Sequence, residues 1–103
     1  MTMPPADTAT LRLLEEFASD WGLDDARITA ETWLKVDLGF ESADLMQLFS
    51  ALREEYPGLP LPFQDLVLRN GRFVPDLQVA EIVAFVSEAL ERALSGVGRE
   101  AAE

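Results

Sequence analysis

Apolar side chains recur at helical spacing through residues 42–56, and this apolar stripe requires other parts of the chain to pack against it. Its members are Leu45, Leu48, Phe49, Leu52 and Tyr56. A helix with one apolar face is stable in water only when that face packs against other elements. Pro57 and Gly58 follow directly, and both residue types end helices. The spacing therefore predicts a helix from about Ser42 to Tyr56 that needs helical partners.

A segment near the N-terminus has the same periodicity. Asp7 is a candidate N-cap, and Gly22 a candidate stop, for a helix that ends at about Trp21. Its apolar face comprises Leu11, Leu13, Leu14, Phe17, Ala18 and Trp21. Residues 1–6 are small, polar or proline, and we expect them to form a disordered tail.

The C-terminal third contains the last expected helix. Asp76 is a candidate N-cap for a helix from Leu77 to about Leu94. Its apolar face comprises Val79, Ile82, Val83, Phe85, Val86, Ala89 and Leu90. Gly96 and Gly98 are expected to end this helix. This leaves residues 95–103 as a flexible tail and residues 7–94 as the folded domain.

Residues 22–41 connect the first two helices and are too apolar for a free linker. The apolar residues of this connection are Ile28, Trp33, Leu34, Val36, Leu38 and Phe40. We expect the loop to lie over the helices and plug the core, with Trp21 and Trp33 as core residues.

The segment after Pro62 is open to two interpretations. Residues 63–70 are compatible with a short third helix that stops before Gly71. Asn70-Gly71 is also a strong hairpin signal between two short runs, but an isolated hairpin is marginally stable. We favour the helix, which makes the fold all-α: a small four-helix bundle of three long helices and one short one, with a long loop between helices 1 and 2. The stretch from Arg69 to Pro75 has no explanation at this level.

The composition excludes several kinds of function. The 103 residues include no cysteine and no histidine, so the chain has neither thiolate metal ligands nor the base of a Ser-His hydrolase, and we expect no metal. The net charge of −11 at pH 7 repels nucleic-acid phosphates and attracts basic protein surfaces. No apolar run approaches the roughly 20 residues of a membrane span, and no secretory signal is evident. We therefore expect a cytoplasmic protein that binds neither nucleic acid nor membrane.

The candidate site is Ser42, which stands where the long loop enters the second helix. Gly39, three residues earlier, permits a tight backbone approach. The stretch from Gly39 to Ala43 reads Gly-Phe-Glu-Ser-Ala and resembles the Gly-x-Asp-Ser-Leu attachment motif of the acyl carrier protein family. Residues 28–34 are similar to that family's first-loop stretch, and residues 76–86 to the opening of its last helix. The resemblance extends over residues 8–94.

The resemblance implies that a phosphopantetheinyl transferase moves 4'-phosphopantetheine from coenzyme A onto the Ser42 hydroxyl. The arm would supply the thiol that a chain without cysteine lacks, and acyl groups would be held on it as thioesters. The protein would be a monomeric, non-catalytic carrier for a fatty-acid or polyketide-type pathway. Its other partners would be enzymes that load or process acyl groups, such as ligases, ketosynthases or acyltransferases.

The resemblance also implies a docking surface along the second helix. This surface comprises Glu41, Ala43, Asp44, Met46, Gln47, Glu54 and Glu55. The carboxylates would pair with basic residues of a partner, and Met46 would offer an adaptable apolar contact. Two residues depart from the family motif: Glu41 replaces the usual aspartate, and Ala43 replaces the usual leucine that contacts the transferase.

Several alternatives stay open. A peptidyl or aminoacyl carrier is the nearest, although that branch usually has a glycine pair two residues before its serine, which this chain lacks. A small acidic adaptor is supported by the charge alone. A scaffold that is never modified is supported by the substitutions at residues 41 and 43. By its position alone, Ser42 is also typical of a helix N-cap.

Overall fold

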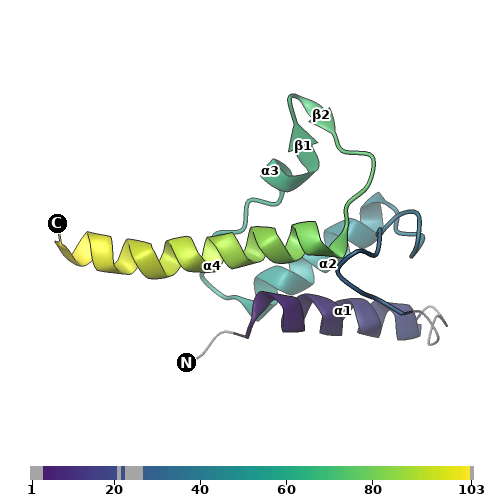
Figure 1. The fold of residues 1–103 in the computed structure, drawn as a ribbon, viewed down its shortest axis with the longest axis horizontal. Helices are drawn as coiled ribbons and strands as arrows, with labels where there is room; N and C mark the ends of the chain where they lie inside the picture. The colour runs from purple at the N-terminus through teal and green to yellow at the C-terminus, as the bar shows by residue number, and fades with distance from the viewer. Residues whose placement is uncertain (1–3, 21, 23–26, 103) are drawn as a thin grey trace.

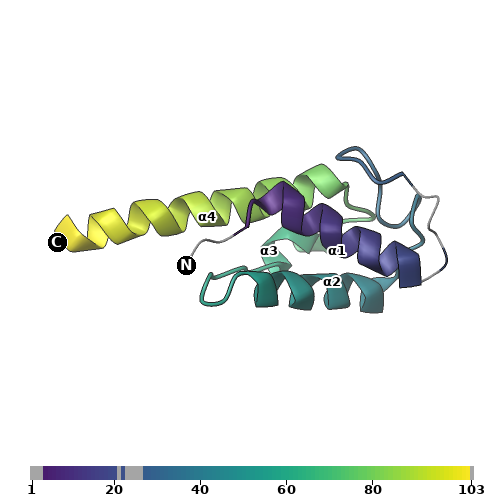
Figure 2. The same ribbon diagram turned by 90° about the horizontal axis from the view of Figure 1, so that it is seen from below.

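The apolar stripes form helices that pack against one another in the computed structural model, which describes residues 4–20, 22 and 27–102, with side chains described as far as residue 94. The elements in chain order are α1 (Ala6–Asp20), α2 (Ser42–Glu55), α3 (Gln64–Val67), β1 (Leu68–Arg69), β2 (Arg72–Phe73) and α4 (Val79–Ala102). Helix α1 lies against both α2 and α4 (Figures 1 and 2). No helix in this described part is long and apolar enough to cross a membrane.

Three aromatic rings join α2, the connector after it and α4 in the core. Phe49 of α2 stacks on Phe63, with ring centroids 4.1 Å apart. Phe85 of α4 lies 5.3 Å from the Phe63 ring, and the Arg53 guanidinium covers that ring at the same distance. Aromatic pairs at such distances contribute beyond the area that they bury. The apolar faces predicted from helical spacing therefore meet in one core, which also contains Leu14, Leu48, Leu52, Ile82 and Val86.

The first loop covers one end of this core. Leu34, Leu38 and Phe40 are buried, which confirms for these residues that the loop plugs the core. Trp33 and Val36 are instead 39% and 78% exposed, so the prediction that Trp33 is a core residue is wrong. The loop forms a tight turn here, and successive side chains of a turn cannot all face the same side.

The same loop supplies acceptors for the N-terminus of α4. The N–H groups of Val79 and Ala80 donate to the carbonyl oxygens of Thr32 (3.0 Å) and Ala30 (2.8 Å). A helix start leaves such donors unsatisfied unless another group accepts from them. Asp76, the expected N-cap, lies before the first residue of α4. Its carboxylate accepts hydrogen bonds from N–H groups of the first loop.

The region after Pro62 corrects the preference for a helix through residue 70. Helix α3 ends at Val67, and an antiparallel hairpin follows, with Leu68 opposite Phe73 and Arg69 opposite Arg72. Asn70 and Gly71 both have positive φ (55° and 77°), which is the backbone of the tight hairpin turn that this residue pair favours. The N–H of Val74 donates to the carbonyl of Val67 (2.8 Å), which continues the hairpin ladder by one pair to the last residue of α3; among the described residues these two strands join no larger sheet. The fold is four helices plus this hairpin, which projects from the bundle (Figure 1).

The ends of the outer helices also differ from expectation. Helix α4 continues through Gly96 and Gly98 to Ala102, so its expected end near Leu94 is wrong. A glycine inside a helix costs about 1 kcal/mol relative to alanine, which weakens a helix without forcing it to stop. Its distal part extends beyond the other helices (Figure 1). At the other end, α1 begins at Ala6, whereas residues 1–3 of the expected tail and Trp21 lie outside the described residues.

Because of Tyr56, at the end of α2, we expect the free energy of unfolding to fall at alkaline pH. Its side chain is fully buried, and its hydroxyl donates to the carbonyl of Pro4 (2.9 Å). Burial raises the pKa of this hydroxyl above its ordinary value of 10.0, the charge of Asp7 raises it further, and that of Arg12 opposes the rise. As the pH rises above 10.0, the unfolded chain releases this proton before the folded protein does, so the free energy of unfolding falls.

The check is urea unfolding near neutrality and above pH 10, in the wild type and in Tyr56→Phe. The variant should lose about 1 kcal/mol at neutral pH with the hydrogen bond, and should show a smaller alkaline loss. Equal alkaline losses in the two proteins would refute the assignment. Because Tyr56 is the only tyrosine, tyrosinate absorbance reports its titration directly.

Candidate functional site

Ser42 is the first residue of α2 and is presented to solvent by the end of the long loop. The N–H of Gly39 donates to the carbonyl of Lys35 (2.9 Å), and that of Phe40 donates to the carbonyl of Leu34 (3.0 Å). Gly39 has a φ of 74°, and a Cβ built on it would meet no atom within 4 Å. Glycine is therefore needed here for its backbone conformation, and the expected tight approach is wrong. The turn directs the chain into the helix with Phe40 buried and Ser42 outside.

The N-cap of α2 is Glu41, and Ser42 is the residue that follows it. The N–H of Glu41 donates to the carboxylate of Asp44 (2.9 Å), and its carbonyl accepts from the N–H of Leu45 (3.0 Å). Ser42 thus does not serve as the N-cap, which removes the simplest structural explanation for a serine here. Among the described residues, its hydroxyl has no hydrogen-bond partner.

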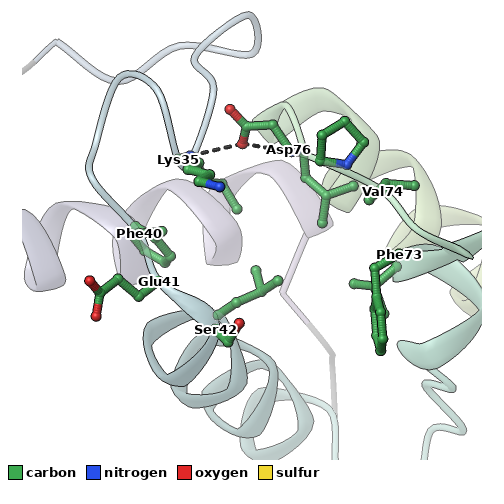
Figure 3. A pocket seen from close by; sticks show the side chains of 12 residues that line it. Lys35, Phe40, Glu41, Ser42, Phe73, Val74 and Asp76 are labelled. Atoms are coloured by element: carbon green, nitrogen blue, oxygen red, sulfur yellow. Dashed lines mark hydrogen bonds between the residues drawn. The ribbon is translucent and has the colours of Figure 1, made fainter.

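A partly open pocket of about 580 Å³ lies beside Ser42. It is lined by Leu34, Lys35, Phe40, Glu41, Ser42, Leu45, Val67, Phe73, Val74, Pro75, Asp76 and Leu77. Figure 3 shows Ser42 and Phe73 on opposite sides of this pocket, with Lys35 and Asp76 along its edge and the Glu41 carboxylate directed away from it. The pocket is therefore built by the loop, the N-terminus of α2 and the return strand of the hairpin.

Asp76 holds the loop wall of the pocket to the segment before α4. One carboxylate oxygen accepts from the N–H of Lys35 (2.8 Å) and of Leu77 (2.8 Å), and the other from the N–H of Val36 (3.1 Å). Both oxygens are thus engaged with backbone donors, which fixes the position of Lys35 relative to the hairpin.

Replacing Asp76 by alanine is expected to loosen this wall. The change leaves three N–H groups without their acceptor and should lower the free energy of unfolding by roughly 1–2 kcal/mol. Hydrogen exchange at the amides of Lys35 and Val36 should become faster. Asp76→Asn keeps one side-chain oxygen and should retain part of the protection. Unchanged exchange in Asp76→Ala would show that the carboxylate does not hold the loop.

The residues expected to form the docking surface lie in three different environments: a shallow groove, the exposed start of α2, and half-buried positions with partners in the chain. Met46, Gln47 and Glu54 line a shallow groove of about 360 Å³ together with Phe17 of α1. Met46 is 56% exposed, as an adaptable contact requires. Glu41 and Ala43 are exposed at the start of α2. Asp44 and Glu55 are half-buried and already engaged, the first with the N–H of Glu41 and the second in an ion pair with Arg12.

From the sequence alone, no role at this site was expected for three residues that line the pocket: Lys35, Phe73 and Asp76. Lys35 is the only lysine of a strongly acidic chain, which is a signal that could have been noticed. Phe73 belongs to the Arg69–Pro75 stretch, whose function had no explanation; the structure places it opposite Ser42 (Figure 3). Asp76 was expected to cap a helix. Across the described residues there is no group of three or more side chains suited to hold a metal ion.

The comparisons with known proteins bear on this site directly. A family model described as "Phosphopantetheine attachment site" matches residues 11–70, more than half of the chain. Neither the curated proteins nor the solved structures give a significant match. The prosthetic group of this family is covalently bound 4'-phosphopantetheine. An exposed serine hydroxyl that has no partner among the described residues, inside the matched range and beside a pocket lined by Lys35, fits such a group. The chain therefore belongs to the family of phosphopantetheine-attachment carrier domains.

Proposed function

We propose that Ser42 carries 4'-phosphopantetheine and that the protein holds acyl intermediates as thioesters on this arm, for a fatty-acid or polyketide-type pathway. The observation that carries the proposal is the position of the Ser42 hydroxyl, which is exposed, unbonded among the described contacts and next to the pocket. In the modification step the Ser42 oxygen bonds to the phosphorus of coenzyme A that bears the pantetheine. The pyrophosphate bond breaks, adenosine 3',5'-bisphosphate leaves, and a base of the transferase takes the hydroxyl proton.

The residues of this chain hold and present the arm, and they catalyse no reaction of the cargo. The first N–H groups of α2 point toward the Ser42 end of the helix, where backbone donors and the helix dipole favour the negative charge of a phosphodiester. The bound group supplies the thiol that the sequence lacks. A tethered substrate then reaches each partner enzyme at a high local concentration.

Docking is proposed to involve the exposed face of α2. Glu41 and Ala43 flank the serine, and the groove of Met46, Gln47 and Glu54 lies further along the same helix. The net charge of −11 favours partners with basic surfaces: the phosphopantetheinyl transferase first, then ligases, ketosynthases or acyltransferases. We further propose a monomeric, cytoplasmic carrier whose domain spans residues 7–94.

The test is intact-protein mass spectrometry after incubation with coenzyme A, magnesium and a broad-specificity phosphopantetheinyl transferase. The expected result is a mass gain of one arm, which fragmentation assigns to Ser42. If the broad transferase fails, the transferases of the host are tested, because Glu41 and Ala43 depart from the usual motif. No gain with any of them would reject the proposal in favour of an unmodified acidic adaptor or scaffold. Loading of amino acids in preference to acyl groups would indicate a peptidyl carrier.

A further inference from the structure

Lys35 places a positive charge in the pocket beside Ser42. It is the only lysine of the chain, and it lines the same pocket as the serine. Its backbone is fixed on both sides, because its N–H donates to Asp76 (2.8 Å) and its carbonyl accepts from the N–H of Gly39 (2.9 Å). Figure 3 shows its side chain turned toward the interior of the pocket. A flexible lysine stem on a fixed backbone can bring its ammonium group to a ligand in this space.

The structure provides no anionic partner for this ammonium group. The ion pairs of the described residues join Arg12 to Glu16 and Glu55, and Arg69 to Glu81, and none of them involves Lys35. Two other charged residues line the pocket, Glu41 and Asp76. The Glu41 carboxylate is directed away from the pocket (Figure 3), and Asp76, whose two oxygens accept from backbone N–H groups, forms no ion pair with Lys35. A cation at the edge of this pocket that forms no ion pair among the described residues is suited to an anion that is added later.

We infer that Lys35 pairs with the phosphodiester that joins the arm to Ser42, and that it is a positioning residue for the arm. The inference rests on the proposed modification of Ser42. A phosphodiester carries one negative charge, and lysine binds phosphate oxygens as a point charge, so the two exposed groups attract each other modestly. The pairing directs the first atoms of the arm into the pocket, toward the wall formed by Phe73 and Val74, and away from open solvent.

The single lysine makes the test specific. Lys35 is dimethylated with isotope-labelled methyl groups, which retain its charge, in the full chain with and without the arm on Ser42. We expect the Lys35 methyl signals to move on attachment and to show nuclear Overhauser contacts with the arm's methylene next to the phosphate. The matched control is the double variant Lys35→Arg, Arg92→Lys, which moves the only lysine to the exposed distal part of α4. Its methyl signals should not move.

Two further measurements use unlabelled protein. The acylation rate of the Lys35 amine should fall roughly two- to fivefold when the arm is attached, the factor expected for an exposed ion pair, with the N-terminal amine as internal reference. The phosphorus NMR signal of the modified protein should move in Lys35→Met and stay near its wild-type position in Lys35→Arg. If the mass gain at Ser42 is present but Lys35 shows the same signals and reactivity in both forms, the inference is wrong while the proposed function stands. If no arm attaches to Ser42, the proposed function itself fails.

Discussion

Ser42→Ala is expected to abolish attachment of phosphopantetheine completely, because the bond to phosphorus forms at the hydroxyl oxygen that the substitution removes. No adjacent residue can replace it, since the phosphodiester forms on a hydroxyl oxygen and neither Glu41 nor Ala43 has a hydroxyl. The fold should not change. Ser42 is exposed, it is not the N-cap of α2, and alanine is a strong helix former, so the free energy of unfolding should change by less than about 0.5 kcal/mol.

The matched control for this loss is Ser50→Ala. Ser50 is an exposed serine on the same helix that lines the shallow groove and not the pocket of Ser42; its replacement by alanine removes no charge from the groove and should leave the mass gain intact. Circular dichroism and urea unfolding of both variants would show that loss of modification is not loss of structure. A full mass gain in Ser42→Ala would place the attachment at another residue and would overturn the assignment of the site.

Phe49→Ala is expected to have the largest effect on stability. Phe49 is 1% exposed and stacks on Phe63, whose ring also contacts Phe85, so its removal leaves a cavity where α2, the connector and α4 meet. Loss of a buried phenylalanine costs about 3–5 kcal/mol. Because a domain of this size typically has a total stability near the lower end of 5–15 kcal/mol, the variant should be largely unfolded at modest urea concentrations.

The control for Phe49→Ala is the same substitution at an exposed phenylalanine. Phe73 of the hairpin is 76% exposed, and Phe73→Ala should change the free energy of unfolding by no more than about 0.5 kcal/mol. Urea unfolding followed by circular dichroism measures both variants. Similar losses in the two proteins would mean that the Phe49 ring is not the packing centre described above.

The sequence supplied the parts of the fold that depend on local spacing. A helical period in residues 42–56, followed by Pro57 and Gly58, was sufficient to place α2, since burial of one face is recorded directly in the order of apolar residues. The family and the candidate serine were likewise recognisable, because the motif around Ser42 is a contiguous stretch of residues. Helix ends were less predictable. Gly96 and Gly98 weaken α4 without ending it, and nothing in their spacing distinguishes the two outcomes.

The choice between helix and hairpin after Val67 shows where local patterns stop being sufficient. Both structures are compatible with residues 63–74, and a hairpin at Asn70-Gly71 is only marginally stable without a sheet. In the structure the hairpin is also held by an ion pair between Arg69 and Glu81 of α4 (3.1 Å). Glu81 belongs to another helix, so the contribution of this ion pair cannot be read from residues 63–74 alone.

The sequence by itself determined the mainly helical class, the apolar faces and the candidate serine, because each is recorded in neighbouring residues. The tertiary structure alone decided the surroundings of Ser42. Lys35 comes from the first loop, Phe73 from the hairpin and Asp76 from the segment before α4, and they share one pocket only because backbone hydrogen bonds to Asp76 and packing against the core bring these segments together. A function that depends on one residue and its neighbours can be predicted from the sequence. A function that depends on the distance between separate segments can be recognised only in the folded structure.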